Sequence, residues 1–251
     1  MDTHNTKCKN CGNEIEARYC SHCGQSAEIG RINLSYLFRN LVYSLFHVDK
    51  GIFHTMKELT FRPGKTIRDY LDGKRQSQFK PFSYLFILAA IYVFCYINLD
   101  LPVYYSVSDI GEVDAIGKDY TSWIINHTGI VQLLFIPIAA LFSFLLFRKS
   151  KYNYGENLVI NTYISGHALL FSIVLLPFMY LLNRLGCGEI VLYFPFPVII
   201  QILMICSVFN TYSKGSRIIR SILWIILQYF AIFFVVTVTM IFHLYFTGSI
   251  Q

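Results

Sequence analysis

The sequence predicts an all-α polytopic membrane protein, with about five transmembrane helices, interfacial amphipathic helices before them and a small N-terminal zinc ribbon with four cysteine ligands. Three observations lead to this prediction. Apolar residues make up 55% of the 251 residues and charged residues only 14%, with a mean hydropathy of +0.47, whereas soluble domains average roughly 45–50% apolar and 25% charged residues. Long apolar segments recur from residue 82 onward, and four of the seven cysteines lie within the first 23 residues. This composition excludes a disordered chain, a coiled coil, a disulfide-rich secreted domain and an ordinary cytosolic enzyme.

The first predicted element is a zinc ribbon over residues 1–28. It contains two Cys-x-x-Cys pairs separated by eight residues, formed by Cys8, Cys11, Cys20 and Cys23. Four thiolates at this spacing suit a tetrahedral zinc ion. Gly12 and Gly24 each follow a pair, where a tight turn directs backbone amides toward the sulfur atoms. Because the segment is too short for a hydrophobic core, metal binding would supply its folding free energy.

Other roles for these cysteines fit less well. Paired disulfides require an oxidising compartment, whereas the basic residues nearby favour the reducing cytoplasmic side. A thioredoxin-like redox pair requires a βαβ domain, for which the segment has no room. The charges of Lys7, Lys9 and Arg18 nearly cancel those of Glu14 and Glu16. The ribbon is therefore expected to contact a protein partner rather than nucleic acid.

Residues 29–81 are predicted to form basic amphipathic helices beside the membrane. Apolar residues within 34–46 recur at helical spacing on one face, and shorter helices are expected over 52–59 and 65–71. Basic amphipathic helices suit the cytoplasmic membrane surface. The simplest role is to orient the chain and to pack under the bundle. The alternative is a site for anionic lipid headgroups or phosphate, formed by Arg62, Lys65, Arg68, Lys74 and Arg75.

Residues 82–251 are predicted to form the transmembrane bundle. The expected spans cover about 82–99, 129–147, 158–182, 190–212 and 221–247. Each has about the 20 residues that cross a hydrocarbon core of roughly 30 Å. None contains Asp, Glu, Lys or Arg, so a series of buried helices in a soluble protein is a poorer interpretation.

The basic residues predict the orientation of these spans. Nineteen Lys and Arg residues fall in the N-terminal segment and in the loops after the second and fourth spans, against two in the alternate loops. By the positive-inside rule, the N-terminus is cytoplasmic and the C-terminus lies outside the cytoplasmic membrane.

The third span carries the densest group of polar residues. Asn161 and Ser165 can share one helix face, and Ser165-Gly166 would allow a neighbouring helix to approach closely. Hydrogen bonding between helices is the simplest role for this group. A ligand or catalytic pocket that uses His167 and Asn161 is the alternative.

The stretch from Phe61 to Tyr70 (FRPGKTIRDY), followed by Gly73-Lys74-Arg75, resembles an uncharacterised bacterial domain-of-unknown-function family. Its members are multi-pass membrane proteins with an N-terminal zinc ribbon. The stretch from Tyr154 to Val159 (YGENLV) is similar to that family too. The resemblance implies this architecture and makes His167 the counterpart of a histidine that members often carry. It implies no activity.

We therefore expect an integral membrane adaptor, sensor or effector, whose ribbon and basic helices contact a protein partner or anionic lipid. Two alternatives stay open: a passive channel or carrier for a small or lipidic solute, and a lipid-headgroup enzyme. The sequence has no His-Glu-x-x-His motif and no carboxylate inside a span, which disfavours an intramembrane protease or an ion-coupled transporter. The balance is against an enzyme, and the oligomeric state, a homo-oligomer included, stays open.

Overall fold

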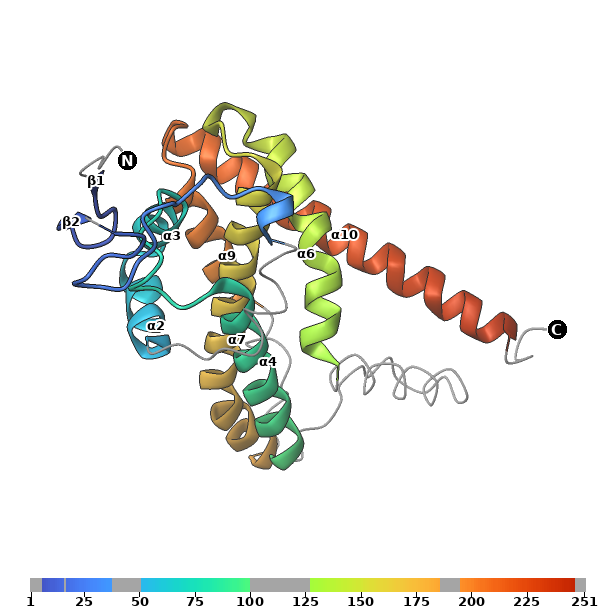
Figure 1. Cartoon of the computed structure of the whole chain (residues 1–251). Coiled ribbons are helices and arrows are strands. Elements are labelled where there is room, and N and C mark those ends of the chain that lie inside the picture. Colours follow the sequence, from blue (N-terminus) through green and yellow to red (C-terminus); the bar gives the residue numbers. More distant parts are fainter. Residues whose placement is uncertain (1–5, 16, 38–50, 100–126, 186–194, 247–251) are drawn as a thin grey trace.

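The computed structural model describes residues 6–15, 17–37, 51–99, 127–185 and 195–246, which are mostly helical (Figure 1). The elements in chain order are β1 (Thr6–Lys7), β2 (Glu14–Ile15), α2 (Ile52–Phe61), α3 (Pro63–Leu71), α4 (Pro81–Asn98), α6 (Thr128–Leu146), the 3-10 turn η1 (Arg148–Ser150), α7 (Tyr154–Arg184), α9 (Pro195–Val208) and α10 (Lys214–Phe246). The two strands form a small antiparallel hairpin within the cysteine-rich segment.

Helix α7 packs against α4, α6 and α9 and forms the centre of the bundle. Helices α4 and α7 approach closely at Gly166, where an added Cβ atom would lie 2.8 Å from Cδ1 of Tyr84 and 3.3 Å from Cα of Leu85. The predicted close approach at this glycine is therefore confirmed. Leu85, Ile160 and Tyr163 are fully buried in the surrounding core.

Helix α3 lies against the carboxyl end of α9. Pro63 begins α3, because its fixed φ suits the first helical position. A Cβ atom at Gly64 would collide with the main chain of Ser207, so only glycine permits this contact. One turn further, Arg68 Nη1 donates to the carbonyls of Ser207 and Val208 at 2.5 and 3.1 Å. The guanidinium satisfies carbonyl groups that a helix end leaves unpaired, and it complements the helix dipole.

Two arginines in the first turns of α10 bind other helix ends. Arg217 Nη1 donates to the carbonyl of Cys206 at 3.1 Å, and Arg220 Nη1 donates to the carbonyl of Leu146. The start of α10 therefore holds the carboxyl ends of α6 and α9 together.

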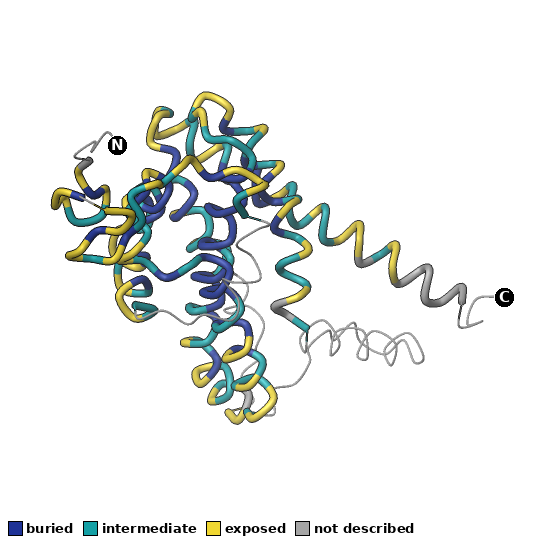
Figure 2. The backbone as a smooth tube through the Cα atoms, viewed as in Figure 1, coloured by how far each residue is buried: buried dark blue, intermediate teal, exposed yellow. Residues whose placement is uncertain are grey.

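Three helical segments are long and apolar enough to cross a membrane, namely Pro81–Asn98, Tyr154–Leu182 and Lys214–Thr239. They match the predicted spans at 82–99, 158–182 and 221–247. The carboxyl-terminal half of α10 extends away from the other helices (Figure 1). Those of its residues up to 239 whose burial is described are exposed or half-buried (Figure 2). Its exposed apolar side chains include Phe230, Phe233 and Phe234.

The predicted spans at 129–147 and 190–212 correspond to α6 and α9, in which the apolar segments among the described residues are Ile130–Leu146 and Phe196–Val208. Helix α9 has 14 residues, which is about 21 Å at a rise of 1.5 Å per residue. It ends at Val208, so the described residues 209–212 at the end of the predicted span are not helical. Residues 190–194 lie outside the described residues.

The amphipathic helices predicted over 52–59 and 65–71 form as α2 and α3. Both contact α7. The helix predicted over 34–46 is described only at residues 34–37, which are helical. Residues 38–46 lie outside the described residues.

Candidate metal centre

The four cysteines of the predicted ribbon converge on one point. Their sulfur atoms all lie within 4.8 Å of one another. Sγ of Cys8 is 3.5 Å from Sγ of Cys23, and Sγ of Cys11 is 3.5 Å from Sγ of Cys20. A tetrahedral zinc centre with four sulfur ligands and Zn–S distances near 2.3 Å has sulfur atoms about 3.8 Å apart. The four thiols are thus close enough to bind a single metal ion.

The two Cys-x-x-Cys turns share one hydrogen-bond pattern. In the first, Cys8 N donates to Asn13 O at 2.7 Å, and Gly12 N donates to Cys8 O at 2.8 Å. Cys20 and Gly24 repeat this pattern in the second turn. Both glycines have positive φ, 82° and 75°, a conformation that other residues adopt with strain. Their predicted role in tight turns is confirmed.

Backbone amides inside the turns favour the metal-binding form of two cysteines. The amide of Cys11 hydrogen-bonds to the Cys8 sulfur and lowers the pKa of Cys8 to about 6. The amide of Cys23 lowers the pKa of Cys20 in the same way. Because the thiolate rather than the thiol ligates metal, the turns favour the ligating form of Cys8 and Cys20, whereas burial and the neighbouring thiols raise the pKa of Cys11 to about 12.

Both turns are fastened to the loop between α3 and α4. Oε1 of Gln25 accepts from the backbone amides of Arg75 and Gln76 at 3.0 and 3.2 Å. Oδ1 of Asn10 accepts from the amide and the hydroxyl of Ser77 at 3.3 and 3.0 Å. Each half of the ribbon therefore supplies one acceptor to the loop that leads into α4.

Gly73 opens the same loop and lets the ribbon come close. Its φ is +110°, and a Cβ atom there would lie 2.9 Å from Cδ of Lys9 and 3.1 Å from Cγ2 of Ile29. The glycine thus meets two requirements, a left-handed backbone and contact with the ribbon.

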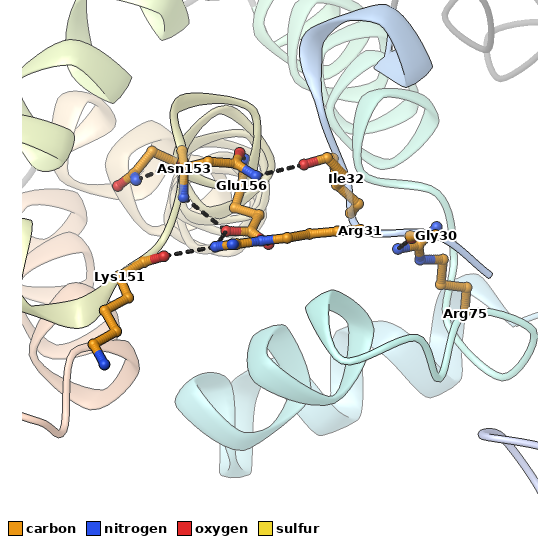
Figure 3. Close-up of polar contacts among 8 residues, drawn as sticks. Gly30, Arg31, Ile32, Arg75, Lys151, Asn153 and Glu156 are labelled. Carbon is orange, nitrogen blue, oxygen red and sulfur yellow. Dashed lines mark hydrogen bonds and ion pairs between the residues drawn. The ribbon is translucent and has the colours of Figure 1, made fainter.

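The segment after the ribbon is tied to the amino end of α7 (Figure 3). Asn153 Oδ1 accepts from the amide of Glu156 at 2.8 Å, and Glu156 Oε2 accepts from the amide of Asn153 at 2.7 Å. This reciprocal pair is a capping box. Asn153 Nδ2 also donates to the carbonyl of Ile32 at 2.8 Å. A Cβ atom at Gly155 would lie 3.0 Å from the carbonyl carbon of Asn33, so the segment passes directly over the helix start.

Arg31 completes this attachment. Its Nε and Nη2 bind Oε1 and Oε2 of Glu156 at 2.7 and 2.8 Å, and Nη2 also donates to the carbonyl of Lys151 at 2.6 Å. The carboxylate is 5% exposed and the guanidinium side chain 60% exposed. The hydrogen bonds that Arg31 donates to Glu156 raise the pKa of the guanidinium.

The five basic residues predicted to bind anions lie in different surroundings. Arg68 caps α9, and Lys74 Nζ forms an ion pair with Oδ1 of Asp69 at 2.9 Å. Arg75 donates to the carbonyls of Tyr70 and Gly30 at 3.3 and 3.0 Å. The remaining two, Arg62 and Lys65, are exposed. Anion binding at these residues stays a prediction.

Asn161 and His167 contact different neighbours. Nδ2 of Asn161 donates to Ser143 Oγ on α6 at 2.9 Å. Nδ1 of His167 lies 2.9 Å from the hydroxyl of Tyr84 on α4, and its Nε2 lies 3.4 Å from Oγ1 of Thr60 on α2. Both residues are buried and join helices, so the structure does not bring the two together in one site.

Several residues that hold the ribbon in place were not predicted from the sequence. Asn153 and Glu156 carry a recognisable signal, since Asn-x-x-Glu before an apolar segment is typical of a helix start. Asn10, Gln25 and Arg31 carry none, because their partners lie far away in the chain.

The fold and the cysteine cluster define a helical protein with apolar helices that fit a membrane and an N-terminal site that could hold a metal ion. A family model described as protein of unknown function (DUF3667) matches residues 49–93, which cover α2, α3 and most of α4. This match fits the resemblance to an uncharacterised family. No curated protein and no solved structure matches the chain. Within the matched segment, Gly64 and Arg68 contact α9, and Gly73 contacts the ribbon.

Proposed function

We propose that the protein is an integral membrane adaptor or sensor, in which a zinc-bound ribbon on the cytoplasmic side presents a surface to a protein partner. The observation that carries this proposal is the double attachment of the ribbon. Gln25 and Asn10 bind the loop before α4, and Arg31 binds the start of α7. A change in metal occupancy would therefore reach two helices of the bundle.

Zinc is the ion that the donor set favours. Four thiolates in a small tetrahedral site suit zinc, and a ribbon of this size depends on its metal for folding. The hairpin buries little besides Ile15 and two of the cysteines. The metal ion would hold together Cys8, Cys11, Cys20 and Cys23.

The outer face of the ribbon offers a surface for the partner. Tyr19 is 64% exposed, and Arg18, Ser21 and His22 beside it are also exposed. Exposed tyrosines with mixed polar neighbours are common anchors in protein interfaces. The exposed Arg62 and Lys65 would contact anionic lipid headgroups at the membrane surface.

The proposed membrane arrangement has five spans, with the N-terminus in the cytoplasm of a bacterial cell. This arrangement is supported by the position of the basic loops after α6 and α9, which lie near the ribbon. Arg31 binds the carbonyl of Lys151, and the amide of Lys149 donates to the Tyr212 hydroxyl at 2.7 Å. The loops after α6 and α9 therefore lie at the ribbon end of the bundle, which agrees with the positive-inside rule.

The contacts of Asn161 and His167 support this proposal over a lipid-headgroup enzyme. Asn161 Nδ2 binds Ser143 and the carbonyl of Asn157, at 2.9 and 2.7 Å. Both ring nitrogens of His167 face hydroxyl groups of other helices. Such contacts are typical of polar side chains that join helices in a membrane.

The test is cross-linking mass spectrometry on membranes that contain the wild-type chain, Cys20→Ser/Cys23→Ser or Tyr19→Ser. We expect the wild type to cross-link reproducibly to one protein through the ribbon. Both variants should lose this cross-link, but only the cysteine variant should also lose zinc. An unchanged cross-link in the zinc-free variant would contradict the proposal.

A further inference from the structure

A pocket of about 380 Å³ lies where the ribbon, the linker that follows it (residues 29–33) and the helix bundle meet. This volume is within the range of small-molecule sites. The lining residues used below are Lys9, Arg31, Asp72, Lys151, Tyr152 and Glu156. They come from the first Cys-x-x-Cys turn, the linker, the end of α3, the loop before α7 and α7 itself.

Two of the three cations at this pocket are available to a ligand. The fork of Arg31 already binds Glu156 through two hydrogen bonds. Lys9 and Lys151 form no ion pair with any described residue. Nζ of Lys9 lies 3.7 Å from the position of a Cβ atom on Gly73, which places the ammonium group beside the end of α3.

These groups favour a phosphate over a carboxylate. A planar guanidinium fork binds carboxylates and phosphates in the same bidentate way, and the fork here is occupied, so a ligand meets the two lysines instead. Lysine binds phosphate as a point charge, and a tetrahedral phosphate accepts hydrogen bonds from several directions. Tyr152 adds a phenol to the lining, and burial raises its pKa, so the hydroxyl keeps its proton to donate.

One anion at the pocket restricts the choice of phosphate compound. Asp72 is exposed, and within the described residues its carboxylate is in no ion pair. It would repel a bare phosphate, but it would accept a hydrogen bond from a hydroxyl or ammonium group close to the phosphate. Glu156 has little effect of this kind, because Arg31 neutralises it.

We propose that this pocket binds a phosphate ester with a hydroxyl or ammonium group next to the phosphate. Lys9 and Lys151 hold the phosphate, and Asp72 holds the neighbouring donor. Glycerol phosphate and phosphoethanolamine have this chemistry, both as soluble compounds and as headgroups of phospholipids. Because Lys9 belongs to the ribbon and Lys151 to the bundle, the ligand joins the two. The inference does not depend on partner recruitment, since binding is measured on the purified chain.

The experiment is calorimetric titration of the full-length, zinc-loaded protein in dodecyl maltoside, a detergent without phosphate. The probes are inorganic phosphate, glycerol 3-phosphate, phosphoethanolamine and short-chain dihexanoyl phosphatidylethanolamine. We expect at least one ester to bind about tenfold more tightly than inorganic phosphate, because one added hydrogen bond to the charged Asp72 contributes about this factor. Tighter binding of the short-chain lipid would identify a headgroup site, and equal or weaker binding a soluble ligand.

Three variants make the test specific. Lys9→Gln/Lys151→Asn should bind the preferred ester about tenfold more weakly or worse; asparagine is chosen because residue 151 has a φ of 60°, which asparagine tolerates. Asp72→Asn should reduce the preference for the ester over inorganic phosphate. Lys149→Asn removes the same charge outside the pocket and should bind as the wild type does.

Zinc content and melting temperature establish that each variant is folded. Native mass spectrometry of the same samples detects any phospholipid that co-purifies with the protein. A phospholipid that is retained by the wild type and by Lys149→Asn but lost from Lys9→Gln/Lys151→Asn would support the proposal as well as the titration does. A wild-type protein that neither binds any probe nor retains a phospholipid would overturn the proposal. So would equal binding by the wild type and Lys9→Gln/Lys151→Asn.

Discussion

Arg31 and Glu156 lie 125 positions apart in the chain and form an ion pair with two hydrogen bonds, at 2.7 and 2.8 Å. Glu156 is at the same time half of the capping box that begins α7. One carboxylate therefore fixes the start of the central helix and holds the segment that follows the ribbon. Through Arg31 and Glu156, the segment after the ribbon is joined directly to α7.

Replacing Arg31 with Gln should weaken the attachment of the linker. The change leaves Glu156, which is 5% exposed, without its counter-charge. Breaking a buried ion pair costs about 3–5 kcal/mol, and the exposure of Arg31 reduces this to about 1–2 kcal/mol. Thermal unfolding measures the loss. Arg18→Gln, which removes an exposed charge from the ribbon, is the control, and an equal loss in both variants would contradict the account.

Gln25→Ala should release the ribbon from the bundle without releasing zinc. The substitution removes an acceptor that binds two backbone amides but leaves all four cysteines. Limited proteolysis should then cut the segment between the ribbon and α2 several times faster, while zinc content stays at one ion per chain. Asn13→Ala, which alters only an exposed side chain, should be cut at the wild-type rate. Equal rates for both variants would show that Gln25 does not hold the ribbon.

Zinc affinity should fall as the pH drops toward and below 6. The pKa of Cys8 is lowered from 9.0 to about 6, so the sulfur is a thiolate above pH 6 and a thiol below it. Protons then compete with the metal ion for the ligand. Competition with a chromophoric chelator at pH 7.5 and pH 5.5 measures the difference. An affinity that does not change between these values would contradict the role of Cys8 as a ligand.

Gly166→Ala should force α4 and α7 apart. The new methyl group would lie 2.8 Å from the ring of Tyr84 and 3.3 Å from the main chain of Leu85, and overpacking of this kind costs about 1–3 kcal/mol. Gly215→Ala is the matched control, because nothing lies within 4 Å of its Cβ position. Alanine there should be neutral or stabilising by up to about 1 kcal/mol. Detergent-induced unfolding compares the two variants, and the reverse order would refute the close packing.

The cysteine cluster that could hold a metal ion could be predicted from the sequence because it is local. Its four cysteines lie within one short segment, and Gly12 and Gly24 mark the turns. The contacts of Arg68 could not be predicted, because its partner Ser207 lies 139 positions away. Without that partner, the charge of Arg68 suggests a lipid surface, whereas in the structure it caps a helix.

For the helices too, features that depend on neighbouring residues in the sequence could be predicted, and features that depend on distant contacts could not. Apolar composition located the three helices among the described residues that are long and apolar enough to cross a membrane, because hydropathy is a local property of the sequence. Composition does not say where a helix ends, so α9 ends at Val208 rather than at residue 212 as the predicted span does. The direction of α10 (Figure 1) depends on the contacts of Arg217 and Arg220 with the ends of other helices, which no periodicity reveals.

The central claim is that metal in the ribbon controls the loop before α4 and the start of α7. Hydrogen exchange of the full-length protein, with zinc and after chelation, tests it most directly. The account predicts faster exchange after chelation at the amides of Arg75, Gln76 and Ser77 and around Ile32, with the buried centre of α7 unchanged. The claim would be contradicted if the amides of Arg75 and Gln76 still exchanged slowly after chelation had removed the zinc and unfolded the ribbon.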